Sequence, residues 1–191
     1  MLNKRLFWKN VVGVKNNILA EELDEHSLIW HLKKGDQVIG EGDTVTEIPF
    51  IVSGVLKAVY KDEFGKNRVY CFGYIPGETA TSISSLKAGV KAACTIVAVK
   101  ECTLVCVSLD YLVELVKSNI EVAKIYNRML SLSLKRGIEH EKTIASYDIR
   151  RRYKWFTEVY PGLAEQVSKK DIASYLHMAP ESFSRILKEN L

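Results

Sequence analysis

The pattern of hydrophobic and polar positions changes twice along the chain. Residues 1–31 are expected to be mostly helical, with a second helix starting near Asn17 or Leu19 and an acidic turn at Glu21–Glu25. From Leu32 to about Ser108, short runs rich in β-branched and aromatic residues are separated by glycine turns. Many short strands at this spacing indicate a barrel or jelly roll. From Leu109 onward, apolar residues recur at steps of three and four, which predicts helices.

The β-rich part contains five clear strand candidates, each bounded by turn residues. They are Ile48–Val52, Val55–Tyr60, Arg68–Phe72, Ala92–Val99 and Thr103–Val107. Together with the helices on either side, they predict an α+β chain whose β-roll is followed by helices alone.

A short helix is expected at Tyr111–Lys117, capped by Ser108 or Asp110, and a long helix from about Ile120 to Ile144. The long helix has two apolar stripes, and therefore needs two partners. One partner is expected to be its own β-roll, and the second is most economically the same helix of another subunit. The alternative is that both stripes are buried within one subunit. The stripes are Val122, Ile125, Met129 and Leu132, and Tyr126, Leu130, Leu134 and Ile138.

The next helix is expected to start at Ser146–Asp148 and to end at Pro161-Gly162. Its apolar side consists of Ile149, Tyr153, Phe156 and Tyr160. The run Arg150–Arg152 either contacts phosphate or forms a solvated face.

Residues 168–188 are typical of a helix-turn-helix, the unit that places its second helix in the major groove of DNA. Pro180 fits the first turn of that second helix, where a missing N–H costs nothing. The apolar set is Ile172, Leu176, Met178, Phe183 and Ile186, with Ala173 where the two helices cross. Burying this set leaves polar residues free on the second helix, namely Glu181, Ser182, Ser184, Arg185 and Lys188. A merely structural helical hairpin is the alternative.

The net charge of +4 is confined to the C-terminal part of the 191-residue chain. Residues 1–120 hold 14 Lys and Arg against 14 Asp and Glu, whereas residues 121–191 hold 13 against 9. The positive excess therefore coincides with the helix-turn-helix, as phosphate binding requires. No signal peptide or membrane span is expected, so we expect a cytoplasmic protein without a membrane partner.

Metal, redox and catalytic chemistry find little support in the chain. Its four cysteines have no metal-ligand spacing, and Cys94, Cys102 and Cys106 fit strands as small apolar residues. The four histidines are scattered, and none lies in residues 32–108. An enzyme of the cupin type would need two or three His inside that barrel. We therefore expect no enzyme activity, no metal site and no cofactor.

A glycine-punctuated β-roll, a long helix and a terminal helix-turn-helix, in this order, resemble the cyclic-AMP receptor protein and fumarate–nitrate regulator (Crp/Fnr) superfamily. The ending Tyr160-Pro161, Pro180 and the stop at Leu191 resemble the short regulators of this family common in Bacteroidetes. The local matches are Gly40–Asp43, Phe50–Gly54, Lys61–Lys66, Pro76–Glu78, Asp171–Ala173 and Glu181–Ile186.

The resemblance implies a homodimeric transcription factor with three parts. These are a β-roll sensor domain with N-terminal helices (1–118), a dimerisation helix (119–145) and a helix-turn-helix DNA-binding domain (146–191). Its partners would be double-stranded DNA, a second copy through the central helix, an unidentified small-molecule effector and, for an activator, RNA polymerase. The alternative is an effector-binding or protein-interaction module with a vestigial helix-turn-helix.

Carried over residue by residue, the resemblance makes Glu181 and Arg185 the base readers. Arg fits the O6 and N7 acceptors of guanine, and Glu can accept from cytosine N4. Phosphate contacts would come from Ser168, Lys169 and Ser182, with Lys170 and Lys188 as weaker candidates.

The sensor departs from the pattern of a cyclic-nucleotide site, which needs a Glu for the ribose and an Arg for the cyclic phosphate. Aligned by the turn Gly77-Glu78, these positions fall on Ser82 and Ala92. Lys91 is expected on the opposite face of the strand. A buried phosphodiester without Arg would be left unpaired, so we expect no tight binding of cyclic AMP or cyclic GMP. Iron–sulfur sensing is also unsupported, because no cysteine precedes Cys71.

A hydroxyl-rich stretch occupies the same place in the sequence. It either serves another polar effector or is a solvated turn that starts a short helix. Its residues are Thr79, Thr81, Ser82, Ser84 and Ser85.

Two departures affect the stability of the helix-turn-helix. His177 stands where a glycine usually accepts a positive φ, at a cost of roughly 1 kcal/mol. Ala179 stands where Ser or Thr would cap the second helix, which costs about 1 kcal/mol more. Neither residue is on the base-reading face, so we expect a marginally stable reader.

Overall fold

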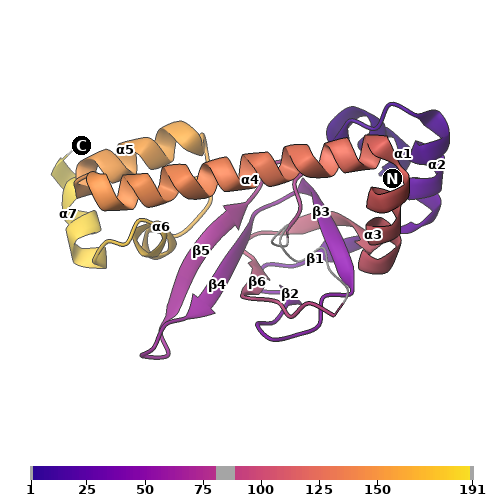
Figure 1. Ribbon diagram of the computed structural model, residues 1–191. Helices are drawn as coiled ribbons and strands as arrows, with labels where there is room; N and C mark the ends of the chain where they lie inside the picture. The colour runs from indigo at the N-terminus through magenta and orange to yellow at the C-terminus, as the bar shows by residue number, and fades with distance from the viewer. Residues whose placement is uncertain (1, 81–88, 190–191) are drawn as a thin grey trace.

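The computed structural model describes residues 2–80 and 89–189. A β-roll with N-terminal helices lies at one side, a small helical domain lies at the other end, and the long helix α4 runs across both (Figure 1). The helices are α1 (Lys4–Phe7), the π-helix η1 (Trp8–Val12), α2 (Asn17–Glu25), α3 (Leu109–Ser118), α4 (Ile120–Ser146), α5 (Ile149–Val159), α6 (Lys169–Tyr175) and α7 (Pro180–Glu189). The strands are β1 (Ser27–Leu32), β2 (Gln37–Ile39), β3 (Glu47–Ser53), β4 (Leu56–Lys61), β5 (Asn67–Gly73), β6 (Thr95–Ala98) and β7 (Cys102–Ser108). This architecture confirms the predicted α+β fold.

The β-roll consists of two antiparallel sheets, with strand orders β1-β7-β3 and β2-β6-β4-β5. Between them lies a core of side chains that are almost fully buried, including Ile51, Leu56, Ile96 and Leu104. Burying each such side chain contributes about 2 kcal/mol. Cys102 and Cys106 are buried in β7, where desolvation raises the pKa of the Cys106 thiol to about 12.

Two expectations for the N-terminal part are wrong. β1 lies within the region expected to be helical, because it pairs along its whole length with β7, about 75 residues later in the chain. The acidic residues Glu21–Glu25 form the second half of α2 and not a turn. The three-residue strand β2 was not expected either, and the strand expected at Ala92–Val99 shortens to β6.

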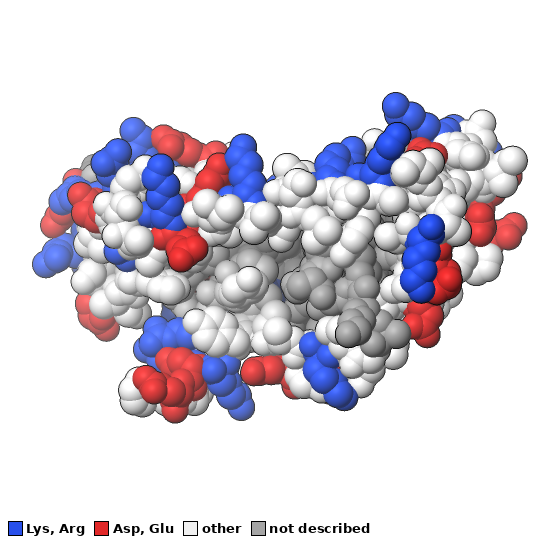
Figure 2. Space-filling model, viewed as in Figure 1, with Lys and Arg blue, Asp and Glu red and all other residues white. Residues whose placement is uncertain are grey.

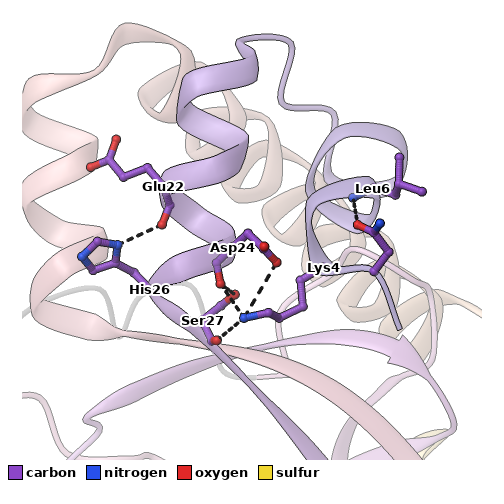
Figure 3. Close-up of polar contacts among 7 residues, drawn as sticks. Lys4, Leu6, Glu22, Asp24, His26 and Ser27 are labelled. Atoms are coloured by element: carbon purple, nitrogen blue, oxygen red, sulfur yellow. Dashed lines mark hydrogen bonds and ion pairs between the residues drawn. The ribbon is translucent and has the colours of Figure 1, made fainter. Parts of the chain in front are cut away.

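Lys4 fixes the junction between α2 and β1. Its ammonium group donates to the main-chain oxygens of Asp24 and Ser27, the second at 2.6 Å, and lies 3.8 Å from the Asp24 carboxylate (Figure 3). His26 Nδ1 lies 2.9 Å from the Glu22 carbonyl oxygen at the end of α2. These contacts turn the chain from helix to strand at Ser27.

The longer helices begin at side chains that cap their free N–H groups. Asn16, Asn119 and Asp148 accept such bonds at 2.9 Å at the starts of α2, α4 and α5. Ser108 occupies the cap position of α3 but makes no side-chain cap bond.

The two apolar stripes of α4 have different fates. Val122, Ile125 and Met129 pack on the core that α1, α2 and α3 form with the β-roll. Farther along α4, Leu132, Leu134 and Ile138 are 46%, 66% and 57% exposed. Leu132 was predicted to lie in one stripe with Val122, Ile125 and Met129, but it is exposed where those three residues are packed. These three side chains are therefore largely open to solvent within one chain, whereas Arg136 and His140 on the same part of α4 contact other elements.

The C-terminal helices are docked on the β-roll. Phe156, Tyr160 and Tyr175 share a core with Val69 and Phe72 of β5. β5 is an edge strand, and α6 covers its free edge, where the Val69 N–H donates to Ser174 Oγ at 3.0 Å. Among the described residues, no helix is both long and apolar enough to cross a membrane.

Candidate nucleic-acid interface

The helix-turn-helix is formed by α6 and α7 and the short turn between them. His177 lies in that turn with φ 53°, and it is the single non-glycine residue with positive φ in the described ranges. The Met178 N–H closes the turn on the Ala173 carbonyl oxygen at 2.8 Å. Pro180 is the first residue of α7, as predicted.

The core of this unit contains the apolar residues that the sequence predicts. Ala173, Leu176 and Phe183 are at most 1% exposed, and Ile172 and Ile186 are 2% exposed. Because this face is buried, the opposite face of α7 is turned outward. Glu181, Ser184, Arg185 and Lys188 are exposed on it, and Ser182 is half-buried.

Uncompensated positive charge surrounds this face. Exposed cationic side chains lie on both helices, and none of their charged groups forms a hydrogen bond or ion pair with another described residue. They are Lys169, Lys170, Arg185 and Lys188. Figure 2 shows Lys and Arg, with Asp and Glu among them, over this end of the molecule. Free cations on a protruding helix can contact phosphates without first breaking an internal ion pair.

Ser168 and Ala179 stand at the starts of the two helices. Ser168 caps α6, because its Oγ accepts from the Asp171 N–H at 3.0 Å and donates to the Asp171 carboxylate at 2.8 Å. Ser168 must therefore share its hydroxyl between this cap and any phosphate. At α7, the Phe183 N–H bonds to the Ala179 carbonyl oxygen at 3.0 Å, but Ala179 has no side chain that could cap the helix.

Of the three arginines after Asp148, Arg150 and Arg151 are exposed, as the alternative of a solvated face predicts, whereas Arg152 is half-buried and bonds within the protein, which the sequence did not indicate. Arg152 donates to the main-chain oxygens of Ile144 at 2.7 Å and Leu176 at 3.2 Å. It thereby ties the end of α4 to the helix-turn-helix. Arg151 lies 4.3 Å from the centre of the Tyr147 ring, and Arg150 pairs with Glu189.

His140 forms a second connection between α4 and α6. Its Nε2 lies 2.9 Å from the Tyr175 carbonyl oxygen, and its ring stacks on the Tyr175 ring at 4.3 Å. Burial lowers the pKa of His140, and the nearby His177 adds to this effect. His140 is therefore held as a neutral ring between two helices.

At the candidate sensor site, Gly77 has φ +87°, and its N–H donates to the Ile51 carbonyl oxygen at 2.8 Å. The Glu78 carboxylate is not free, because Arg136 of α4 contacts both of its oxygens at 2.6 and 2.8 Å. This pair links the turn before the hydroxyl-rich stretch to the long helix.

The remaining sensor residues are only partly placed. Thr79 lines an apolar cavity between the N-terminal helices, β3 and α4, together with Trp8, Phe50 and Met129. Ala92 is buried, whereas the neighbouring Lys91 is exposed and donates to Thr44 Oγ1 at 2.7 Å, as strand alternation predicts. The other candidates, Thr81, Ser82, Ser84 and Ser85, lie outside the described residues.

Comparison with known proteins identifies the architecture. Residues 29–119 match the family model of the cyclic nucleotide-binding domain. FixK2 from Bradyrhizobium japonicum has a TM-score of 0.73 at 18% identity, over 85% of this chain and 83% of that one. The c-di-GMP responsive global regulator CLP from Xanthomonas campestris has a TM-score of 0.72 at 16% identity, over 90% and 89%.

A third structure, assigned to the Crp/Fnr family of transcriptional regulators from Eubacterium rectale, has a TM-score of 0.72 at 16% identity. It aligns over 96% of this chain and 85% of that one. A search of the curated proteins found no significant match. Residues 29–119 are therefore similar to cyclic nucleotide-binding domains. The chain as a whole has the fold of the Crp/Fnr transcriptional regulators, which confirms the resemblance seen in the sequence.

Proposed function

We propose that this protein is a sequence-specific DNA-binding transcription regulator that acts as a homodimer in the cytoplasm. The observation that carries the proposal is the outer face of α7, where Glu181, Ser184, Arg185 and Lys188 are exposed above a buried apolar core. A helix that presents polar side chains from a rigid support is suited to reading base edges in the major groove.

The contacts on this face divide into two kinds. Arg185 and Glu181 read base edges, because their planar groups match guanine acceptors and the cytosine amino group. Lys169, Ser168 and Ser182 position the protein on phosphates, and Lys170 and Lys188 add positive charge nearby. Ser184, on the same exposed face, lies within reach of the groove.

Dimerisation is assigned to α4. Leu134 and Ile138 are more than half exposed and lie four residues apart on one side of a 27-residue helix. A second copy of this helix would bury them in a coiled seam along a two-fold axis. The two recognition helices would then face successive turns of the major groove.

The sensor domain is inferred not to bind cyclic AMP or cyclic GMP tightly. Ala92 has no charge for a cyclic phosphate, and Glu78 is already neutralised by Arg136. An effector of another class would bind near Gly77 and Thr79 and reach α4 through the Glu78–Arg136 pair. The proposal includes no catalytic role, and RNA polymerase becomes a partner if the regulator activates transcription.

The test is a selection from random duplex DNA with the ligand-free protein at two salt concentrations. We expect enrichment of a two-fold symmetric site with half-sites about one helical turn apart. Enrichment of no sequence, with salt-sensitive general binding alone, would contradict specific reading by the ligand-free protein. It would favour a vestigial helix-turn-helix or a requirement for an effector.

A further inference from the structure

The hairpin of β4 and β5 lies directly against the helix-turn-helix. Asp171 of α6 pairs with Lys57 of β4 at 2.7 Å, and Ser174 of α6 accepts from the Val69 N–H of β5 at 3.0 Å. Beyond these contacts the hairpin projects past α6, on the side away from α4 (Figure 1). The β-roll therefore places a protruding element beside the recognition unit.

The tip of this hairpin has a fixed shape. One oxygen of the Asp62 carboxylate accepts from the N–H groups of Phe64 at 3.1 Å and Lys66 at 2.9 Å, and the other accepts from Arg68 Nε at 2.8 Å. The bond from the Lys66 N–H is the largest reason that the pKa of Asp62 is lowered. A loop held this way presents its neighbouring side chains without a large ordering cost on binding.

The hairpin carries more positive than negative charge, and part of that charge is free. It holds four positively charged residues, Lys57, Lys61, Lys66 and Arg68, and two negatively charged ones, Asp62 and Glu63. The side chains of Lys61 and Lys66 are exposed, and their ammonium groups have no hydrogen bond or ion pair with any other described residue. Arg68 lies close enough to His177 to contribute, after burial and Arg152, to lowering the pKa of that turn residue. The base of the hairpin therefore lies near the turn between α6 and α7, where Lys57 also pairs with Asp171.

The proposed dimer determines where the DNA ends would pass. If α4 lies along the two-fold axis, the centre of the operator faces the end of α4, and each half-site lies over α6 and α7. The DNA beyond a half-site then leads away from α4, toward the side on which the hairpin projects (Figure 1). Strands rise about 3.3 Å per residue, so Lys61 and Lys66 lie roughly 7–10 Å beyond the contact at Val69.

We propose that the β4–β5 hairpin is a second DNA contact, in which Lys61 and Lys66 bind backbone phosphates outside each half-site. The inference rests on the proposed function, and it adds a sequence-independent contact made by the sensor domain itself. The hairpin would extend the footprint without changing which bases are read. It would also make the position of the β-roll sensitive to bound DNA.

The experiment compares two duplexes that contain the site enriched in the selection described above. The short duplex ends at the outermost selected base pairs, and the long duplex carries 12 further base pairs of unrelated sequence on each side. Binding is measured against salt concentration for the wild type, for Lys61→Ala/Lys66→Ala, and for Lys15→Ala/Lys117→Ala. The last variant removes the same charge near α2 and α3, at the opposite end of the molecule.

Each lost phosphate contact lowers the slope of log K against log salt by about 0.9, and a dimer has two hairpins. Two lysines in each of two hairpins make four contacts, so we expect Lys61→Ala/Lys66→Ala to reduce the slope by about 3.6 on the long duplex. The same variant should bind the short duplex with the salt dependence of the wild type and should keep its base preference. The control variant should match the wild type on both duplexes.

An equal loss on both duplexes, or an equal loss in the control, would mean that general charge and not a flank contact is responsible. No change in Lys61→Ala/Lys66→Ala would overturn the inference, and would leave a protein partner as the reason for the exposed Phe64 at the tip. A wild type that binds neither duplex overturns the proposed function itself.

Discussion

Arg185 is the residue on which sequence-specific binding should depend most, because its guanidinium group is exposed on the outer face of α7 and pairs with no other residue in the described ranges. We predict that Arg185→Ala weakens binding to the selected site by about 1–3 kcal/mol and relaxes preference at one base pair of each half-site. Competition binding against single-base variants of the site measures both effects. Lys169→Ala is the matched comparison, and it should weaken all sequences alike and flatten the salt dependence. Identical behaviour of the two variants would mean that the roles are assigned wrongly.

His177 stores backbone strain at the turn of the helix-turn-helix. With φ at 53°, its backbone lies in the left-handed region, which glycine adopts without penalty because it has no Cβ. We predict that His177→Gly raises the free energy of unfolding by roughly 1 kcal/mol relative to His177→Ala, since both variants lose the ring and only one loses the strain. Denaturant unfolding of the two variants measures this difference. Equal stability would show that the turn relaxes at no cost.

His140 should make stability depend on pH. Burial, with a contribution from His177, lowers its pKa in the fold, whereas the unfolded chain binds a proton near the ordinary value of about 6.5. As pH falls through about 6.5, the unfolded state takes up a proton before the folded state does. The contribution of His140 to the free energy of unfolding is therefore complete above about pH 6.5 and is lost as the pH falls toward the lower pKa of the folded state. We predict that the free energy of unfolding of His140→Phe falls less between pH 7 and pH 5 than that of the wild type. His31→Asn, at an exposed position of β1, should behave like the wild type.

At the scale of elements, the proposed dimer depends on the exposed part of α4. We predict that Leu134→Asp/Ile138→Asp gives a folded monomer, because both side chains are already exposed within one chain. Sedimentation at micromolar concentration measures the assembly, and Lys142→Asp on the same helix serves as the control. Monomers should also lose affinity for a two-half-site duplex. A dimer that survives both substitutions would place the interface elsewhere.

The helices were predictable from the sequence because their pattern is local. The predicted end of α4 at Ile144 differs by two residues from Ser146, and the helix-turn-helix core agrees residue by residue. β1 was not predictable in the same way, because Leu28 is 63% exposed and the strand exists through its pairing with β7. The outward face of α7 follows from its periodicity. The pairs Glu78–Arg136 and Lys57–Asp171 do not, since 58 and 114 residues separate their members.

At the scale of the whole molecule, α4 connects the β-roll to the helix-turn-helix through two residues one turn apart. Arg136 holds Glu78 of the sensor turn, and His140 holds Tyr175 of α6. A displacement of Glu78 would therefore move the same turn of α4 that contacts the helix-turn-helix through His140. A ligand can act through these contacts only if it binds the shifted and unshifted conformations of the turn with different affinity.

Cyclic AMP should not be that ligand. Its phosphodiester would meet the methyl group of Ala92 where a cationic group is needed, and Lys91 is committed to the outer face through Thr44. Arg136 of α4 already has a carboxylate partner, so recruiting it to a phosphate would leave Glu78 unpaired. We predict that calorimetry with cyclic AMP or cyclic GMP detects no binding in the micromolar range, and that neither nucleotide changes the affinity for the selected DNA site. Micromolar binding of either nucleotide would mean that residues other than Ala92, Lys91 and Arg136 hold the phosphate, and that the β-roll contains a cyclic-nucleotide site.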